Sequence, residues 1–178
     1  MAALAADLGV LRTFSTTGRL ATPSVGLVVD RPSQKYFNAC STGKVAAVGA
    51  FLDSRVSPDA RDGYGLTGLI WAGRKGRIEV ANLLLARGAA IDAVDRTGRT
   101  ALYHAVTFRR YDFVRHLASL GAKVSPVDMH AWTPLDFAEV SGDTKMVTTL
   151  VELGAVSTRA RIASLFEARV RPGRRTTR

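Results

Sequence analysis

Residues 95–127 read DRTGRTALYHAVTFRRYDFVRHLASLGAKVSPV, and a related string of equal length precedes this stretch while another related string follows it. Six positions hold the same residue in all three copies. They are Asp62, Asp95 and Asp128; Thr67, Thr100 and Thr133; Leu69, Leu102 and Leu135; Ala72, Ala105 and Ala138; Gly88, Gly121 and Gly154; and Ala89, Ala122 and Ala155. Because all six sets advance along the chain by one constant step, they indicate an internal repeat.

The first half of each copy has the signals of a short helix. Thr67 precedes an apolar stretch, where its hydroxyl can accept a hydrogen bond from a free N–H of the first turn, an effect of about 1 kcal/mol. In the last copy Pro134 follows the threonine, at a place that suits proline. Gly76 and Gly142 tolerate a positive φ and so can end the helix. The pattern predicts a first helix over about 68–75.

A second helix is expected in each copy before the next glycine. Its apolar residues have helical spacing in the first clear copy, at Ile78, Ala81, Leu84 and Leu85. Gly88 ends this helix, and the polar link AAIDAVDRTGRT at 89–100 favours a tight turn between units. Each unit is therefore predicted to be a helix pair with a projecting turn.

Neither predicted helix reaches the length of about 12–15 residues that an isolated helix needs in water. Stacking of neighbouring pairs must then supply the stability, as in solenoids whose units contact only their neighbours. The sequence predicts an all-α solenoid.

The strings TGLIWA, TALYHA and TPLDFA resemble the T-P-L-H-x-A motif of ankyrin repeats. The resemblance covers 29–158 and implies an ankyrin-repeat α-solenoid of four units, at 29–61, 62–94, 95–127 and 128–158. The first unit is degenerate, with Gln34 in place of the threonine and Arg55 in place of the closing glycine, as expected of a terminal cap. Arg109 occupies the position of Gly76 and Gly142, so we expect an irregular turn there.

The N-terminal extension, residues 1–28, contains one acidic residue, Asp7, and is rich in Ser and Thr, with Arg12 and Arg19. It resembles a mitochondrial transit peptide, although no basic residue precedes Arg12. The alternative is an extension that covers the first repeat.

The single cysteine, Cys40, is expected to be a buried small hydrophobe. It indicates an intracellular, reducing compartment, so we expect a soluble cytoplasmic protein, with the mitochondrion as the alternative.

The positive charge is concentrated at the C-terminus. Of the net charge of +10, the last twenty residues contribute seven arginines and one glutamate. Residues 159–170 have helical apolar spacing and predict a C-terminal capping helix on the last repeat. Residues 171–178 form a basic tail with Arg171, Arg174, Arg175 and Arg178. The tail is either a contact for RNA, an acidic protein face or anionic lipid, or a solubilising end without a partner.

No motif for catalysis, a metal or a cofactor is found in the sequence. His104, His116 and His130 lie at unrelated phases of the repeat, without metal-ligand spacing. The pair Asp136 and Glu139 is interpreted as a solvated helix start. No apolar run reaches the roughly 18 residues of a membrane span. We expect a protein that is not an enzyme, has no cofactor and acts as a monomer or as a subunit of a larger complex.

Function is therefore assigned to the variable positions. In the ankyrin family, partners commonly contact the turn tips and the exposed edge of the first helix. Applied to this sequence, that resemblance gives the candidate partner-binding residues Tyr64, Leu66, Arg74, Lys75, Arg96, Arg99, Thr107, Phe108, Met129, His130, Trp132 and Val140. Aromatic and Arg side chains often dominate binding energy. We predict a protein-binding adaptor for an acidic, partly apolar partner.

Two alternatives stay open for these residues. Trp132 and Tyr64 can instead pack on adjacent turns, and Phe108 can fill a gap in the stack. Trp71 and Phe137, which lie one place beyond the strip, are expected in the core. The alternative function is a mitochondrial assembly or RNA-contacting accessory protein that uses the Arg-rich tail.

Overall fold

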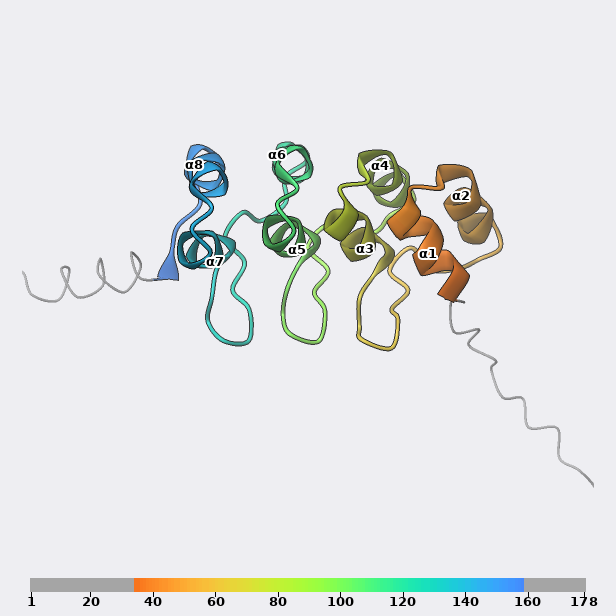
Figure 1. Ribbon diagram of the computed structural model, residues 1–178. Helices are drawn as coiled ribbons and strands as arrows, with labels where there is room; N and C mark the ends of the chain where they lie inside the picture. Colours follow the sequence, from red (N-terminus) through yellow and green to blue (C-terminus); the bar gives the residue numbers. More distant parts are fainter. Residues whose placement is uncertain (1–33, 159–178) are drawn as a thin grey trace, which may run out of the picture.

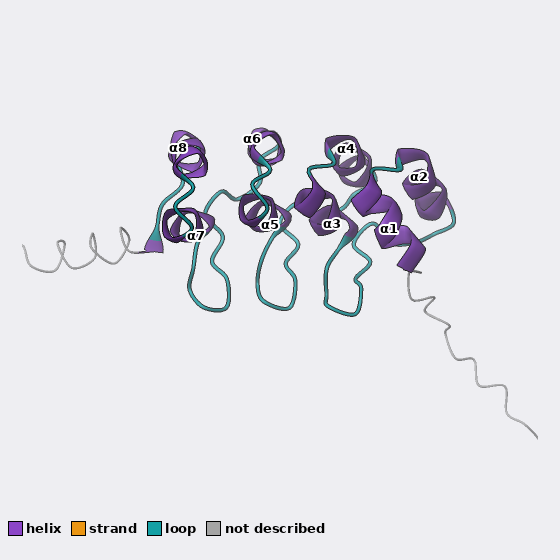
Figure 2. Ribbon diagram, in the orientation of Figure 1, coloured by secondary structure: helices purple, strands orange, loops and turns teal. Residues whose placement is uncertain are grey.

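The computed structural model describes residues 34–158, which form helix pairs stacked side by side in two rows (Figure 1). The inner row consists of α1 (Gln34–Thr42), α3 (Gly68–Lys75), α5 (Ala101–Thr107) and α7 (Pro134–Val140). The outer row consists of α2 (Val45–Asp53), α4 (Ile78–Ala86), α6 (Tyr111–Ser119) and α8 (Thr144–Glu152). Figure 2 shows helices and loops and no strand over 34–158, so the predicted all-α class is confirmed.

The repeated threonines begin the inner helices, as predicted. The side chains of Thr67 and Thr100 accept hydrogen bonds from the backbone N–H groups of Ile70 and Tyr103. Thr133 goes further and forms a capping box, in which Asp136 bonds back to the backbone N–H of the threonine. These caps fix where each short helix starts, because they satisfy donors that the helix itself leaves free.

The turns between inner and outer helices all need a left-handed residue. Gly76 and Gly142 supply it with φ of 70° and 68°. Arg109 has φ of 55° at the equivalent place, so this turn is not irregular in shape; it adopts the same left-handed conformation as the others, at a strain of about 1–2 kcal/mol. Arg55 has φ of 67° where later units have a glycine, and the sequence did not reveal that Ala131 also has a positive φ, of 61°.

The core runs along the stack, between and within the pairs. Leu69, Leu102 and Leu135 are all buried, as are the repeated alanines except Ala155, which is partly buried. α3 approaches its neighbours closely, because a Cβ on Gly68 would lie 2.7 Å from the Tyr36 hydroxyl oxygen, and one on Gly73 2.7 Å from the Ala101 carbonyl oxygen. Each fully buried leucine contributes about 1.5–3 kcal/mol. Neighbouring units thus supply the cohesion that no pair has alone.

A second set of repeated contacts joins the loops of neighbouring units. In each, a polar side chain accepts a hydrogen bond from a backbone N–H of the next unit, at 2.8–3.0 Å. The pairs are Asp59 with Ala90, Asp92 with Lys123, and Ser125 with Val156. Because the three acceptors stand at the same place in successive units, these bonds hold the units in one register.

Several predicted segments lie outside the described residues. They are the N-terminal extension 1–28, the capping helix 159–170 and the basic tail 171–178.

Cys40 is fully buried in α1, and burial raises the pKa of its thiol to about 12, which fits its predicted role as a small hydrophobe. Among the helices of 34–158, none has both the length and the apolar character that a membrane crossing requires.

Candidate protein-binding surface

The hairpin loops are shaped by the repeated aspartates. In each loop, Oδ1 of the aspartate accepts hydrogen bonds from the backbone N–H groups two and four residues later, at 2.7–3.1 Å. The three aspartates are Asp62, Asp95 and Asp128. Because the loop backbone is bonded to a fixed carboxylate, side chains at the tips project from an ordered turn.

The second carboxylate oxygen ties each of the first two loops to an inner helix. Trp71 Nε1 donates to Asp62 at 2.9 Å, and His104 Nε2 lies 2.8 Å from Asp95. Burial lowers the pKa of His104, although Asp95 opposes the shift, so the histidine is neutral near pH 7 and donates through Nε2. Sequence reasoning missed both bonds; a donor nine residues after the repeated aspartate is the signal that could have found them.

The fourth unit satisfies its aspartate differently. Phe137 occupies the place of Trp71 and His104 and has no donor. Instead, Arg99 of the preceding unit binds Oδ2 of Asp128 through Nε and Nη2, at 3.0 and 2.9 Å. Arg99 also lies over the Tyr103 ring, with its Cζ 4.9 Å from the ring centroid. The Arg99 guanidinium is therefore bound to a residue of the next unit.

Two of the twelve predicted contact residues have structural roles. Leu66 is 6% exposed and belongs to the core cluster. Arg99 is held by Asp128, as described above. The sequence could not separate these residues from Trp132, which occupies the same repeat position and is 39% exposed.

The hairpin tips carry exposed side chains, and Figure 1 shows the loops projecting in one direction from the inner row. Tyr64 and Met129 are 77% and 66% exposed, and Arg96 and His130 are also exposed. Tyr64 therefore does not pack on an adjacent turn. These residues form the outer part of the predicted strip.

The inner-helix edge carries the rest of the predicted strip. Arg74 is half-buried, with its Cζ 4.7 Å from the Trp71 ring centroid and 4.8 Å from that of Phe108. Lys75 is exposed, and the Thr107 hydroxyl donates to the Tyr103 carbonyl at 3.1 Å. Trp71, expected in the core, packs against it while remaining partly accessible.

A shallow cavity of about 240 Å³ lies at the end of the described stack. It is lined by His130, Ala131, Trp132, Asp136, Glu139, Val140 and Thr158. Asp136 does not belong to a solvated helix start, because it is buried and bonded to Thr133 and to the backbone N–H of Thr158. Burial opposes its ionisation, but the bonds from Thr133 and Thr158 still lower the pKa of Asp136. Asp136 is therefore part of the cap of α7 and does not form a functional pair with Glu139, which is exposed.

The described residues contain no group of three side chains placed to bind a metal ion. What they present is a rigid row of helix pairs with projecting loops, which defines the class of helical repeat proteins that offer a surface to a partner.

Comparison with protein families identifies this class further. The family model described as ankyrin repeats (3 copies) matches residues 36–128, and the chain belongs to the ankyrin-repeat family. Comparison with curated proteins gives no match. Ankyrin repeats are generally protein–protein interaction modules, and the family is typically non-catalytic.

Proposed function

We propose that this chain binds a partner protein through one strip that joins the hairpin tips to the inner-helix edge. The hairpin–helix strip consists of Tyr64, Arg74, Lys75, Arg96, Thr107, Phe108, Met129, His130, Trp132 and Val140. The observation that carries the proposal is the exposure of large apolar side chains on ordered backbone, above all Tyr64 at 77% and Met129 at 66%.

The proposed mechanism is preorganisation. The aspartate-bonded loops and the capped helices hold the strip in place before a partner arrives, so binding loses less conformational entropy. The strip combines apolar side chains with the cations of Arg74, Lys75 and Arg96. An acidic, partly apolar protein surface complements that combination.

The test is a pull-down from an extract of the native cells, with proteins identified by mass spectrometry. The full chain is compared with a Tyr64→Ala/Met129→Ala double variant and with a control, Leu120→Ala/Val151→Ala. Leu120 and Val151 are 49% and 57% exposed but lie at the end of α6 and on α8, in the outer row. We expect proteins captured by the full chain and the control to be lost by the double variant. Equal capture by all three proteins would show that the strip is the wrong surface.

For the compartment, we propose the cytoplasm, with mitochondrial import as the alternative. N-terminal sequencing of the protein from its native cells distinguishes the two, because an intact N-terminus contradicts a cleaved transit peptide.

The basic tail 171–178 is tested separately. Loss of a salt-dependent association with RNA on its deletion would favour the RNA-contacting alternative.

A further inference from the structure

Arg74 is the one strip residue in the described region whose charged group is held by aromatic rings on two different inner helices. Its guanidinium lies over Trp71, on its own helix, and over Phe108, at the end of α5. We propose that Arg74, with Lys75 beside it, forms an acceptor site for a Glu or Asp carboxylate in an extended segment of a partner protein. The inference rests on the proposed function and names the chemistry at the centre of the strip.

The donors of Arg74 have no acceptor among residues 34–158. A guanidinium carries five N–H donors. Other arginines of this region use theirs on carboxylates, as Arg99 does with Asp128 and Arg109 with Asp143. The Arg74 side chain makes neither a hydrogen bond nor an ion pair with a described residue, and its guanidinium lies over the two rings. A half-buried, oriented guanidinium without an anion is prepared to bind one.

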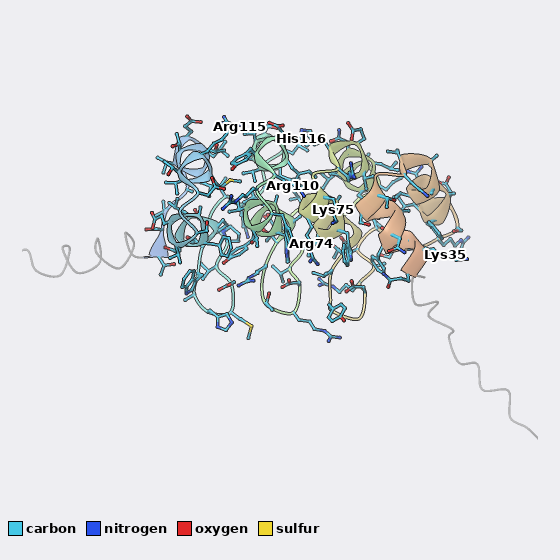
Figure 3. All side chains as sticks on the ribbon, in the orientation of Figure 1. Lys35, Arg74, Lys75, Arg110, Arg115 and His116 are labelled. Atoms are coloured by element: carbon cyan, nitrogen blue, oxygen red, sulfur yellow. The ribbon has the colours of Figure 1, made fainter. Side chains whose placement is uncertain are left out.

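The surroundings of Arg74 are positive. Lys75 is exposed and has no ion pair with a described residue. Arg110 donates from Nε to the Arg74 carbonyl oxygen at 3.1 Å, which brings a third cation close to Arg74; Figure 3 labels the three in the region of α3 and α5. Asp95 forms no ion pair with any of the three, and its oxygens are bonded to His104, Thr97 and the Arg99 backbone.

The aromatic contacts favour a carboxylate over a nucleic acid. Proteins that bind single strands stack bases on free ring faces. Here the guanidinium lies over both rings, so they serve to orient the arginine. The strip also offers apolar area: Phe108, which contacts Arg74, is 38% exposed, and Val140, at the end of α7, is 63% exposed. A carboxylate flanked by apolar side chains matches this pattern, and the planar fork of Arg can bind it through two parallel hydrogen bonds.

The experiment measures residue preference with a positional-scanning library of nine-residue peptides. Each pool fixes one residue, and pools with fixed Glu, Asp, Gln, Asn and phosphoserine are compared. The full chain is tested beside Arg74→Ala, Arg74→Lys and the control Lys123→Ala, which removes one exposed cation from the loop after α6. Thermal unfolding verifies that each variant is folded.

We expect the full chain and Lys123→Ala to enrich Glu and Asp pools at least fivefold over Gln and Asn pools. Arg74→Ala should lose this preference while keeping its preference for apolar residues, and Arg74→Lys should recover only part of it. A merely structural role for Arg74 would lower binding to all pools alike.

Three results would overturn the inference: no enriched pool for the full chain, an unchanged acid preference in Arg74→Ala, or a stronger preference for phosphoserine than for Glu. The proposed function is judged separately by the pull-down. Suppose that the Tyr64→Ala/Met129→Ala variant loses capture while Arg74→Ala keeps the acid preference. This combination would contradict the carboxylate site proposed here and would still support the hairpin–helix strip as the binding surface.

Discussion

The inner helices of the third and fourth units differ in how many described helices they contact, and their sequences differ at two repeat positions. α5 packs between α3 and α7, and on it Tyr103 and Val106 are 0% and 2% exposed. At the same repeat positions α7 has Asp136, which is bonded as a cap, and Glu139, which is exposed. The comparison shows that the repeat keeps the shape of each helix pair while the residues on the second face of the inner helix change: they are apolar on α5, which has a described helix on both sides.

The same two units also differ in how the hairpin is tied down. In the third unit, His104 of the same unit binds Asp95. In the fourth unit, Asp128 is bound by Arg99, which belongs to the third unit. The fourth hairpin therefore depends on a side chain of the preceding unit. Each prediction below tests one part of this contrast.

The largest effect is expected at the repeated leucine. Leu102→Ala should cost close to the upper end of about 2–5 kcal/mol, because its helix is covered on both sides. Leu135→Ala should cost closer to the lower end, because α7 has a described neighbour on one side only. Urea unfolding of both variants measures the difference, and equal losses would contradict the role given to the second neighbour.

The next effect concerns the close approach of α3 and α5. In Gly73→Ala the new Cβ would meet the Ala101 carbonyl oxygen at 2.7 Å and Phe113 Cε1 at 3.2 Å, and we expect a loss of about 1–3 kcal/mol. Glu139→Ala is the matched change at the end of the stack and should stay within about 0.5 kcal/mol. A Gly73→Ala protein as stable as the wild type would show that the helices can separate without cost.

A smaller effect is expected on acidification. The pKa of His104 is lower in the folded than in the unfolded chain, because of burial, so the unfolded state takes up the proton first and stability falls as the pH drops below about 6.5. His104→Phe, which copies Phe137 of the fourth unit, should be less stable at pH 7 but lose this part of the pH dependence. Thermal unfolding from pH 7.5 to 5 checks both expectations; an unaltered pH profile in His104→Phe would contradict them.

Further acidification should destabilise the hairpins themselves. Despite burial, hydrogen bonds lower the pKa of Asp95 and of Asp128, so their stabilisation is present above about pH 3.9 and is lost as the pH falls below it. A transition that stays constant down to pH 3 would argue against these bonds.

The smallest effect, and a stabilising one, is expected from Arg109→Gly. Glycine adopts the positive φ of this turn without strain. Asp143, whose side chain is 8% exposed, keeps its bonds from Tyr111 and the Met146 N–H when the exposed Arg109 is removed, so a gain of about 0.5–1 kcal/mol is expected. Arg110→Gly is the control, since Arg110 has φ of −94° and donates to Arg74. A gain in the control but not in Arg109→Gly would contradict the assignment of strain.

Much of the fold could be predicted from sequence, and less of the candidate site. The constant repeat step, the threonine caps and the closing glycines are visible in the sequence, because caps and turns act within a few residues of themselves. Leu66, Arg99 and Trp132 share one repeat position but have three different environments. Their roles depend on which residues of the adjacent unit face them, and a single-sequence pattern does not contain that information.

By itself, the sequence determined that short helices repeat, where each begins, and that they must stack in order to be stable. The tertiary structure alone decided which repeated positions stay accessible, how Asp136 becomes a buried cap, and that Arg74 lies over rings from two helices. The physical reason is distance along the chain. Caps and turns are satisfied locally, whereas Phe108 reaches Arg74 only after two units have stacked.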